Sequence, residues 1–311
     1  MDRLTTGIKA LDKTLKGGFV RSKPAGIYGV TDIGKSLLVA QLSFYFSREG
    51  KVLWVDTELD LDEETWEWYE SMFTKRWSDA KPSNIKVLQV ANAFEFARYL
   101  SMDLRIEQSK SRVTANIMFP KRIDSKPAKS SELDISSITY SKMWKELSKG
   151  GYVAVFIDSI SKLLKDVISS QTQNLPARAT IIQKWLGFAF ITMSKEFEVP
   201  IISIHHGSVN PQNKYDFGKP WGGQDVFFNT KQVVGILMGT KEQQKHMGIP
   251  DDKITSGELM LRRFIRARSA PRDLPYRYGV LIKYNYGYVD PEDLGYKPYE
   301  ERAVWNPATE R

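Results

Sequence analysis

The segment GVTDIGKS, residues 29–36, constrains the fold of this 311-residue chain more than any other stretch. It fits the pattern G-x-x-x-x-G-K-[ST], in which glycines let the backbone wrap around a phosphate group with its N–H groups pointing inward. An apolar run suited to a strand precedes it at 25–30, and a run suited to a helix follows at 35–49. The alternative is a chance match in an ordinary turn. A chance match would not require a strand before the loop and a helix after it, so the presence of both favours the phosphate loop. We therefore predict a loop that binds a nucleoside triphosphate at a helix N-terminus.

Two side chains of this loop have chemical roles in the prediction. Lys35 is predicted as a catalytic residue that reaches the terminal phosphates and neutralises developing charge, and the hydroxyl of Ser36 is expected to be a ligand of Mg²⁺. The predicted cofactors are therefore ATP and Mg²⁺. The residues expected to contact the nucleotide are Gly29, Val30, Thr31, Asp32, Ile33, Gly34, Lys35, Ser36 and Leu37.

The rest of the chain alternates short apolar runs with longer amphipathic ones. This pattern is typical of an α/β fold with a mostly parallel central sheet flanked by helices. After residue 207, β-type runs predict an antiparallel extension at the C-terminal side. The predicted strands are 25–30, 51–56, 84–90, 151–159, 199–206, 230–238, 257–267 and 278–289, and the predicted helices are 35–49, 62–77, 93–108 and about 177–197.

Residues 109–138 interrupt this alternation. They are rich in Ser and Lys, contain Pro120 and Pro127, and show no clear period. A connection of this length inside a compact domain is usually functional or disordered. We therefore expect a single domain over residues 1–311 with a basic insertion at 109–138.

Two acidic residues follow strand-like runs and complete the predicted site. Asp158 ends the run 151–159, where a phosphate loop requires a carboxylate on the metal side, although a cap of the following helix is an alternative role. Glu58 lies just past the run 51–56, where a carboxylate can orient and deprotonate an attacking water. An ordinary surface glutamate is the alternative there. We predict Asp158 as a Mg²⁺ ligand and Glu58 as a catalytic residue.

Two histidines end the run 199–206 beside the predicted phosphate site. A metal-binding pair is disfavoured, because adjacent strand residues face opposite ways and His246 is the only other histidine. Two interpretations of His205 and His206 stay open. They sense the γ-phosphate, with His206 as a catalytic residue, or they are strand-end histidines satisfied by the neighbouring loop.

Basic residues give the chain a formal charge of +8, which suits an anionic partner. Four arginines lie on or just after the run 257–267, and alternation places Arg263 on the face opposite the other three. Aromatic residues in the loop after residue 207 add groups on which bases can stack, so we predict single-stranded DNA binding. A solvated basic strand is the alternative. The predicted DNA-binding residues are Arg262, Arg263, Arg266, Arg268, Tyr215 and Trp221.

Composition restricts the chemistry and the location. The chain has no cysteine, which excludes thiol catalysis, thiolate zinc sites and disulfides, and fits an intracellular protein. Its first residues lack the apolar core of a signal peptide, and no apolar run approaches the ~20 residues of a membrane span. We expect a cytoplasmic protein without a membrane partner.

The order of these motifs resembles the RecA/RadA recombinase superfamily, and most of all the archaeal RadA paralogues of RadB or RadC type, which are related to KaiC. The most specific stretches are LTTGIKALDKTLKGGF at 4–19, the phosphate loop, and RARSAPRDLP at 266–275. The resemblance implies a RecA-like ATPase core that works as a homo- or hetero-oligomer. It also implies that Glu58 is the catalytic glutamate, Asp158 the Walker B aspartate, and His206 a replacement for the glutamine that senses γ-phosphate.

Further segments take their meaning from this resemblance. Residues 208–225 match the second DNA-binding loop, and 269–275 match the segment by which a neighbouring subunit caps the nucleotide. The histidine at position 206, the serine at 269 and the insertion at 109–138 depart from strand-exchange recombinases. The resemblance therefore implies a slow, DNA-modulated ATPase that assists recombination and repair, with a RadA-type recombinase or another repair protein as partner. The alternative is a KaiC-like regulatory ATPase that controls protein assembly without binding DNA.

Overall fold

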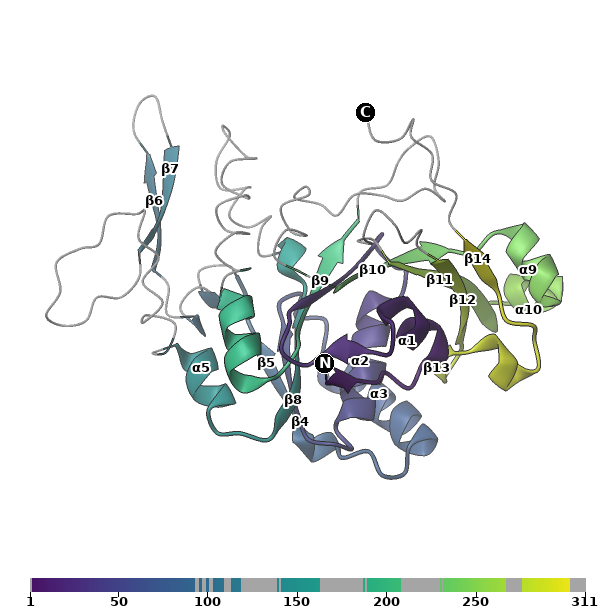
Figure 1. Ribbon diagram of the computed structural model, residues 1–311, viewed down its shortest axis with the longest axis horizontal. Helices are drawn as coiled ribbons and strands as arrows, with labels where there is room; N and C mark the ends of the chain where they lie inside the picture. The colour runs from purple at the N-terminus through teal and green to yellow at the C-terminus, as the bar shows by residue number, and fades with distance from the viewer. Residues whose placement is uncertain are drawn as a thin grey trace, which may run out of the picture.

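A ten-stranded sheet forms the centre of the computed structural model within the residues that it describes (Figure 1). The described residues are 2–92, 95–96, 99–100, 103–108, 113–118, 139, 141–162, 187, 189–207, 230, 232–266 and 276–302. Six neighbouring strands are parallel, which confirms the predicted α/β class. In spatial order these are β10 (Gln232–Met238), β3 (Ala25–Gly29), β9 (Ile201–His206), β8 (Tyr152–Asp158), β4 (Lys51–Asp56) and β5 (Ile85–Gln89).

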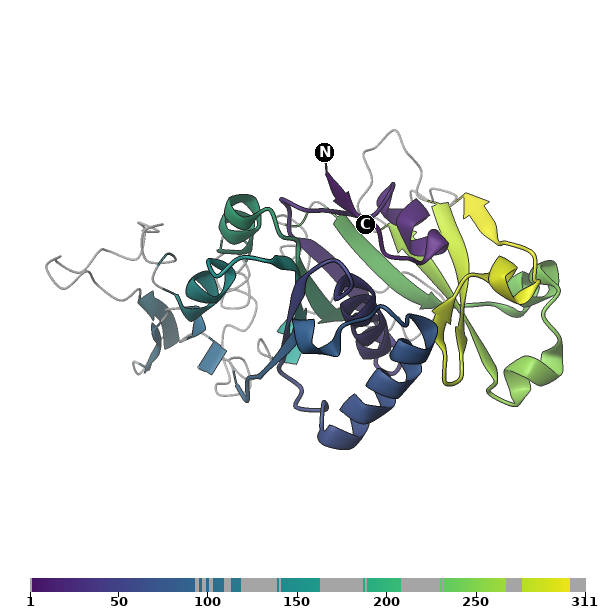
Figure 2. The ribbon, with the colours of Figure 1, turned by 90° about the horizontal axis from the view of Figure 1, so that it is seen from below.

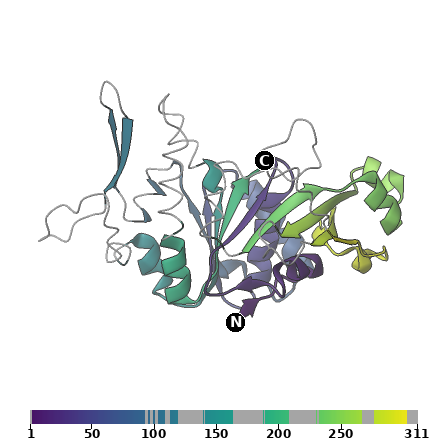
Figure 3. The same ribbon diagram turned by 45° about the horizontal axis from the view of Figure 1, so that its top comes forward.

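An antiparallel extension continues the sheet beyond β10, as the sequence predicts. Figure 3 shows this green and yellow part at one end of the molecule, opposite the strands β6 (Asp103–Gln108) and β7 (Val113–Met118). Two short helices, α9 (Lys241–Met247) and α10 (Asp251–Thr255), lie at the outer end of the extension. Its strands are β11 (Leu259–Arg266), β12 (Tyr276–Lys283), β13 (Gly287–Val289) and β14 (Glu300–Arg302).

Helices cover both faces of the parallel strands (Figure 2). One face packs against α1 (Lys9–Leu15), α2 (Lys35–Phe46) and α3 (Glu63–Arg76), and the other against α5 (Lys142–Leu147) and the helical segment 189–197. Burial on both faces explains why these strands are nearly continuous apolar runs in the sequence. None of the helices in the described residues is long and apolar enough to cross a membrane.

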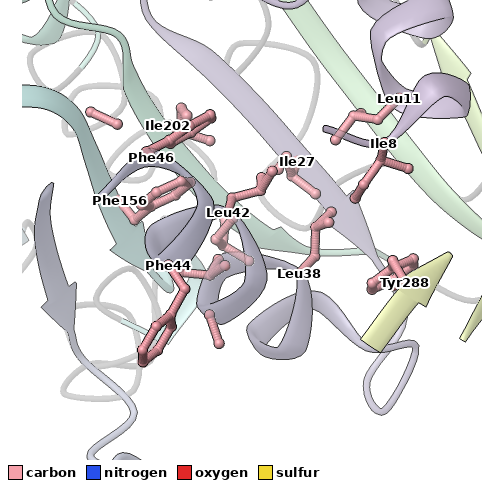
Figure 4. Close-up of a cluster of buried hydrophobic side chains, with 14 of the residues drawn as sticks. Ile8, Leu11, Ile27, Leu38, Leu42, Phe44, Phe46, Phe156, Ile202 and Tyr288 are labelled. Carbon is pink, nitrogen blue, oxygen red and sulfur yellow. The ribbon is translucent and has the colours of Figure 1, made fainter. Parts of the chain in front are cut away.

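The larger core cluster lies between the sheet and the α2 layer (Figure 4). Phe46 of α2 stacks on Phe156 of β8 with ring centroids 6.1 Å apart and planes 7° apart. Leu38 and Leu42 of the same helix are also fully buried. Full burial of such a side chain contributes about 1.5–3 kcal/mol. The helix that follows the phosphate loop is therefore fixed to the sheet along its length.

Helix α1 is capped by a residue from the far end of the chain. Its own N-cap residue, Ile8, has no side chain that can accept a hydrogen bond. Instead, the carboxylate of Asp290 accepts hydrogen bonds from the N–H groups of Lys9, at 2.7 Å, and Ala10, at 2.8 Å. Strand β1 (Arg3–Leu4) precedes α1 in the sequence and pairs with β2 (Phe19–Val20), which follows it. The N-terminal segment is thus tied to the C-terminal extension.

One predicted element has a different structure. The helix expected at 93–108 includes β6 (Asp103–Gln108), which pairs antiparallel with β7 (Val113–Met118) inside the expected insertion. Period-2 alternation and β-branched residues in DLRIEQ and VTANIM favour strands. The helical period of the residues before 103 does not continue into DLRIEQ. The remaining residues of 109–138 lie outside the described residues, as does most of the helix expected at 177–197.

Candidate functional site

The candidate site lies at the carboxyl edge of the parallel strands. Gly29, the last residue of β3, pairs with His206 at the end of β9, and Asp56 at the end of β4 pairs with Asp158 at the end of β8. Loops that leave such an edge meet in the crevice where α/β proteins bind ligands. The fold therefore brings together four predicted positions: the phosphate loop, Glu58, Asp158 and His206.

The phosphate loop has the conformation that its glycines allow. Gly34, just before α2, has φ +102°, and an added Cβ would lie 2.8 Å from Tyr288 Oη and 2.9 Å from Ile282 Cδ1. A Cβ at Gly29 would lie 2.8 Å from Ile33 Cγ2. Both pattern glycines are thus required by backbone angle or by close packing. The loop delivers the chain into the N-terminus of α2, where the first N–H groups have no partner within the helix.

Lys35 lies inside the loop, with only 7% of its surface exposed. Its Nζ donates a hydrogen bond to the carbonyl of Val30 at 2.7 Å. Burial lowers the pKa of Lys35, and the carboxylates of Asp158, Glu58 and Asp32 act in the opposite direction. A buried ammonium that is bonded to a neutral carbonyl gains strongly from an anion placed in the same loop.

Asp158 is a buried carboxyl at the end of β8, 5% exposed, and lies near the side chain of Ser36. Burial raises its pKa to about 7, while the Ser36 hydroxyl and Lys35 act to lower it and Glu58 acts to raise it. The backbone N–H of Lys162 donates to Ser159 Oγ at 3.4 Å, so Ser159 rather than Asp158 contacts the backbone of the following turn. A buried carboxylate beside a hydroxyl fits Mg²⁺, which takes one or two carboxylates together with phosphate and water oxygens.

Glu58 is half-buried, and one oxygen of its carboxylate accepts hydrogen bonds from two side chains. Its Oε1 accepts hydrogen bonds from Ser159 Oγ at 2.6 Å and His206 Nε2 at 2.8 Å. The bond from His206, assisted by Ser159 and opposed by burial, lowers the pKa of Glu58 to about 2. The carbonyl of Glu58 also accepts from Lys162 Nζ at 3.1 Å. These contacts distinguish Glu58 from a free surface glutamate.

The loop that carries Glu58 is shaped by residues that the sequence reasoning missed. The carboxylate of Asp56 accepts hydrogen bonds from the N–H groups of Glu58 and Leu59, both at 3.0 Å. Thr57 Oγ1 donates to the carbonyl of Ser159 and accepts from its N–H, each at 2.8 Å. An aspartate whose side chain bonds the backbone two residues ahead is a common turn signal, and VDTELD contains it.

The two histidines face opposite ways, as alternation predicts. The backbone N–H of His206 donates to Ser161 Oγ at 2.8 Å, and its ring contacts Glu58. His205 is 2% exposed, its Nε2 lies 2.8 Å from Ser203 Oγ, and burial lowers its pKa to about 3. They therefore do not share a metal ion. Within the part of the chain that the structure describes, no group of three or more histidine or acidic residues could hold one.

Two predicted DNA-binding residues are in the interior, which corrects the expectation of an exposed basic ribbon. Arg262 is 8% exposed and Arg263 is 3% exposed. Their Nε atoms donate to the backbone carbonyls of Ile33, at 3.1 Å, and Met238, at 3.0 Å. Both faces of β11 are packed, so these guanidinium groups are not available to a DNA backbone.

The other predicted DNA contacts stay predictions. Arg266, the last residue of β11, is partly exposed and stays a candidate. Arg268, Tyr215 and Trp221 lie outside the described residues, together with the loop 208–225 and the capping segment 269–275.

The mostly parallel sheet flanked by helices and continued by antiparallel strands has a RecA-like architecture. A solved structure that the chain resembles is the crystal structure of the RadB recombinase, with a TM-score of 0.56 and 17% sequence identity over 92% of this chain and 98% of that chain. Neither a protein-family model nor a curated protein sequence matches the chain. The likeness shows that the fold is RecA-like.

Proposed function

We propose that the protein is a RadA paralogue that binds and hydrolyses ATP, binds single-stranded DNA and assists recombinational repair. The observation that carries this proposal is the convergence of Lys35, Asp158, Glu58 and His206 beside a glycine-shaped loop. A fold shared with a protein called a recombinase supports the biological setting.

The first step is nucleotide binding by the loop and its lysine. The N–H groups at the start of α2 hold the phosphates, and Lys35 exchanges its bond with the Val30 carbonyl for one with a phosphate oxygen. Ser36 and Asp158 would hold Mg²⁺. The bound metal ion would neutralise charge on the phosphate oxygens of ATP. Loss of the Asp158 proton accompanies metal binding, because a metal ligand must be ionised.

Glu58 acts on the attacking water, and His206 controls its strength as a base. With a pKa near 2, Glu58 is ionised at neutral pH but accepts a proton poorly. When His206 turns from Glu58 toward the γ-phosphate, the carboxylate loses its largest stabilising contact and its pKa rises. Sensing of the phosphate and activation of the base are then one event. A protein held in the paired arrangement turns ATP over slowly.

The DNA-binding part of the proposal relies on charge outside the interior. The net charge of +8 and the exposed part of Arg266 support it. The protein would work as a homo- or hetero-oligomer. Each subunit would contribute one loop to DNA binding and another to capping the nucleotide of its neighbour. A RadA-type recombinase or another repair protein is the proposed partner.

A second function is favoured by the burial of Arg262 and Arg263. Because these two arginines bind backbone carbonyls, the predicted DNA surface is smaller than the sequence suggests. A KaiC-like regulatory ATPase, whose nucleotide state controls protein assembly, needs no such surface. It uses the same nucleotide site with very slow turnover.

The test is the ATPase rate with and without single-stranded DNA, on protein of known mass in solution. Stimulation by DNA, and affinity for a labelled strand that falls steeply with salt, are expected for the leading function. Absent binding at low salt, combined with ATP turnover, would favour the regulatory alternative. Lys35→Ala is the control, since it removes the cation from the loop and should abolish nucleotide binding. Failure of the wild-type protein to bind ATP would refute both functions.

A further inference from the structure

The outer side of the phosphate loop is bonded to two residues of the antiparallel extension. Arg262 Nε donates to the carbonyl of Ile33 at 3.1 Å. Tyr288 Oη donates to the carbonyls of Ile33, at 3.4 Å, and Gly34, at 3.2 Å. Arg262 comes from β11 and Tyr288 from β13, more than two hundred residues after the loop. The sequence motif contains no sign of either contact.

These bonds fix the direction of two N–H groups. A peptide unit is planar and trans, so its carbonyl and the N–H of the next residue point in opposite directions. A carbonyl of Ile33 held outward by Arg262 therefore directs the N–H of Gly34 inward. The carbonyl of Gly34 accepts the first intrahelical bond of α2, from the N–H of Leu38 at 3.0 Å. Tyr288 adds a second bond that holds the same carbonyl, and with it the inward direction of the Lys35 N–H. These two N–H groups belong to the part of the loop that receives the phosphates.

Arg262 also places a charge behind the loop. Its Nη1 donates to the carbonyl of Leu261 at 3.1 Å, and no acidic side chain in the described residues forms a salt bridge with it. Burial lowers its pKa, but a guanidinium stays protonated in proteins. A buried cation that is bonded only to neutral groups adds to the positive potential in which an anion binds.

Tyr288 is itself rigidly held. Gln41 of α2 donates from Nε2 to the carbonyl of Tyr288 at 2.9 Å and accepts from its N–H at 2.6 Å. Arg76 of α3 donates to the same carbonyl at 2.7 Å. The ring packs against Phe264 of β11, with centroids 5.6 Å apart. The hydroxyl that contacts the loop is thus positioned from three sides.

We propose that Arg262 and Tyr288 are positioning residues of the nucleotide site, which orient the N–H groups of Gly34 and Lys35 toward the phosphates. This role rests on the proposed function, because it assumes that the loop binds a nucleoside triphosphate. It makes the antiparallel extension part of the nucleotide site.

The experiment compares Arg262→Met with Arg263→Met in the full-length protein. Arg263 is a matched control, because it is the adjacent residue, is equally buried and also donates to a backbone carbonyl, but that of Met238. A fluorescent ATP analogue should bind Arg262→Met at least ~10-fold more weakly, as expected for the loss of a hydrogen bond from a charged donor. Arg263→Met should stay within about 2-fold of wild type. Arg262→Lys, which keeps the charge and one donor, should recover part of the affinity.

Amide hydrogen exchange without nucleotide gives a readout that does not depend on ATP binding. Peptides that span residues 29–37 should exchange faster in Arg262→Met than in Arg263→Met. Equal exchange and equal affinity in the two variants would overturn the inference while leaving the proposed function intact. Absence of ATP binding in the wild type would overturn the proposed function, and exchange would still test the orientation of the loop. If Arg262→Met does not fold, Tyr288→Phe, which removes one hydroxyl, should weaken binding by about 3-fold, and unchanged affinity would count against the inference.

Discussion

Asp158→Asn should make the protein more stable in the absence of Mg²⁺ and nucleotide, although it removes a residue of the proposed metal site. Burial raises the pKa of Asp158 from 3.8 to about 7, a difference of about 3 pH units. Each unit corresponds to about 1.4 kcal/mol, so ionisation of this carboxyl destabilises the folded state by about 4 kcal/mol at pH 8. Asparagine has no charge and keeps an oxygen for the Ser36 hydroxyl. Its buried N–H₂ group costs about 1–3 kcal/mol, which leaves a net gain of about 2 kcal/mol at pH 8.

The sign of the pH dependence follows from the raised pKa. The folded state binds the Asp158 proton more tightly than the unfolded state, so this group's stability is complete below pH 4 and is lost as pH rises through about 7. The advantage of Asp158→Asn should therefore shrink by about 2–3 kcal/mol between pH 8 and pH 5, to near zero. Glu58 does not enter this window, because its low pKa confines its loss of stability to pH below 4.5. The lowered pKa of His205 changes the free energy of unfolding of the wild type and of Asp158→Asn by the same amount, so it does not enter their difference.

Urea unfolding at pH 8 and pH 5, followed by tryptophan fluorescence, measures this difference. Asp56→Asn is the control: burial raises the pKa of Asp56 too, but its carboxylate accepts hydrogen bonds from three backbone N–H groups on two oxygens, and asparagine keeps only one of these oxygens. That variant should be destabilised at both pH values. An Asp158→Asn protein that is no more stable at pH 8, or whose advantage does not change with pH, would refute the reasoning.

Three further substitutions test other parts of the structure. Glu58→Gln should bind ATP within about 2-fold of wild type but hydrolyse it at least ~100-fold more slowly in single-turnover assays, and near-normal turnover would remove Glu58 from its role. Gly34→Ala combines φ +102° with a Cβ 2.8 Å from Tyr288 Oη, so calorimetry should find a loss of nucleotide affinity, whereas Gly257→Ala, at φ +77° with open space around it, should leave affinity unchanged. Asp290→Ala removes the cap of α1 and should lower the free energy of unfolding by about 2 kcal/mol, while Asp293→Ala, which loses only an exposed bond to Lys9, should change it by less than about 0.5 kcal/mol. Equal thermal stability of the last two variants would contradict the capping role.

The sequence predicts best what is local. The strand, glycine turn and helix around residues 29–36 depend on neighbouring residues, so the pattern predicts them and the structure has them. The antiparallel extension is also confirmed by the observed strand pairing. It could be predicted because its strands are rich in β-branched and aromatic residues. The error at 103–108 arose where a helical period and a strand period follow one another without a break.

Contacts between distant strands could not be predicted. The bond from His206 to Glu58 depends on β9 lying beside β3 and on β4 pairing in register with β8. Arg262 illustrates the same limit. The spacing of Arg262, Arg266 and Arg268 is typical of a strand with one solvent-exposed face, and only the packing of helices on both sides of β11 shows that Arg262 and Arg263 are buried. The catalytic roles of Glu58, Lys35 and His206 and the metal-binding role of Asp158 stay predictions.

The capping of α1 by Asp290 has a consequence for biosynthesis. The hydrogen bonds from Lys9 and Ala10 span 281 and 280 positions along the chain. During translation, α1 leaves the ribosome well before Asp290 and receives its cap only after the residues between them have been made. Native contacts of such long range form slowly, so α1 stays without its cap while these residues are synthesised.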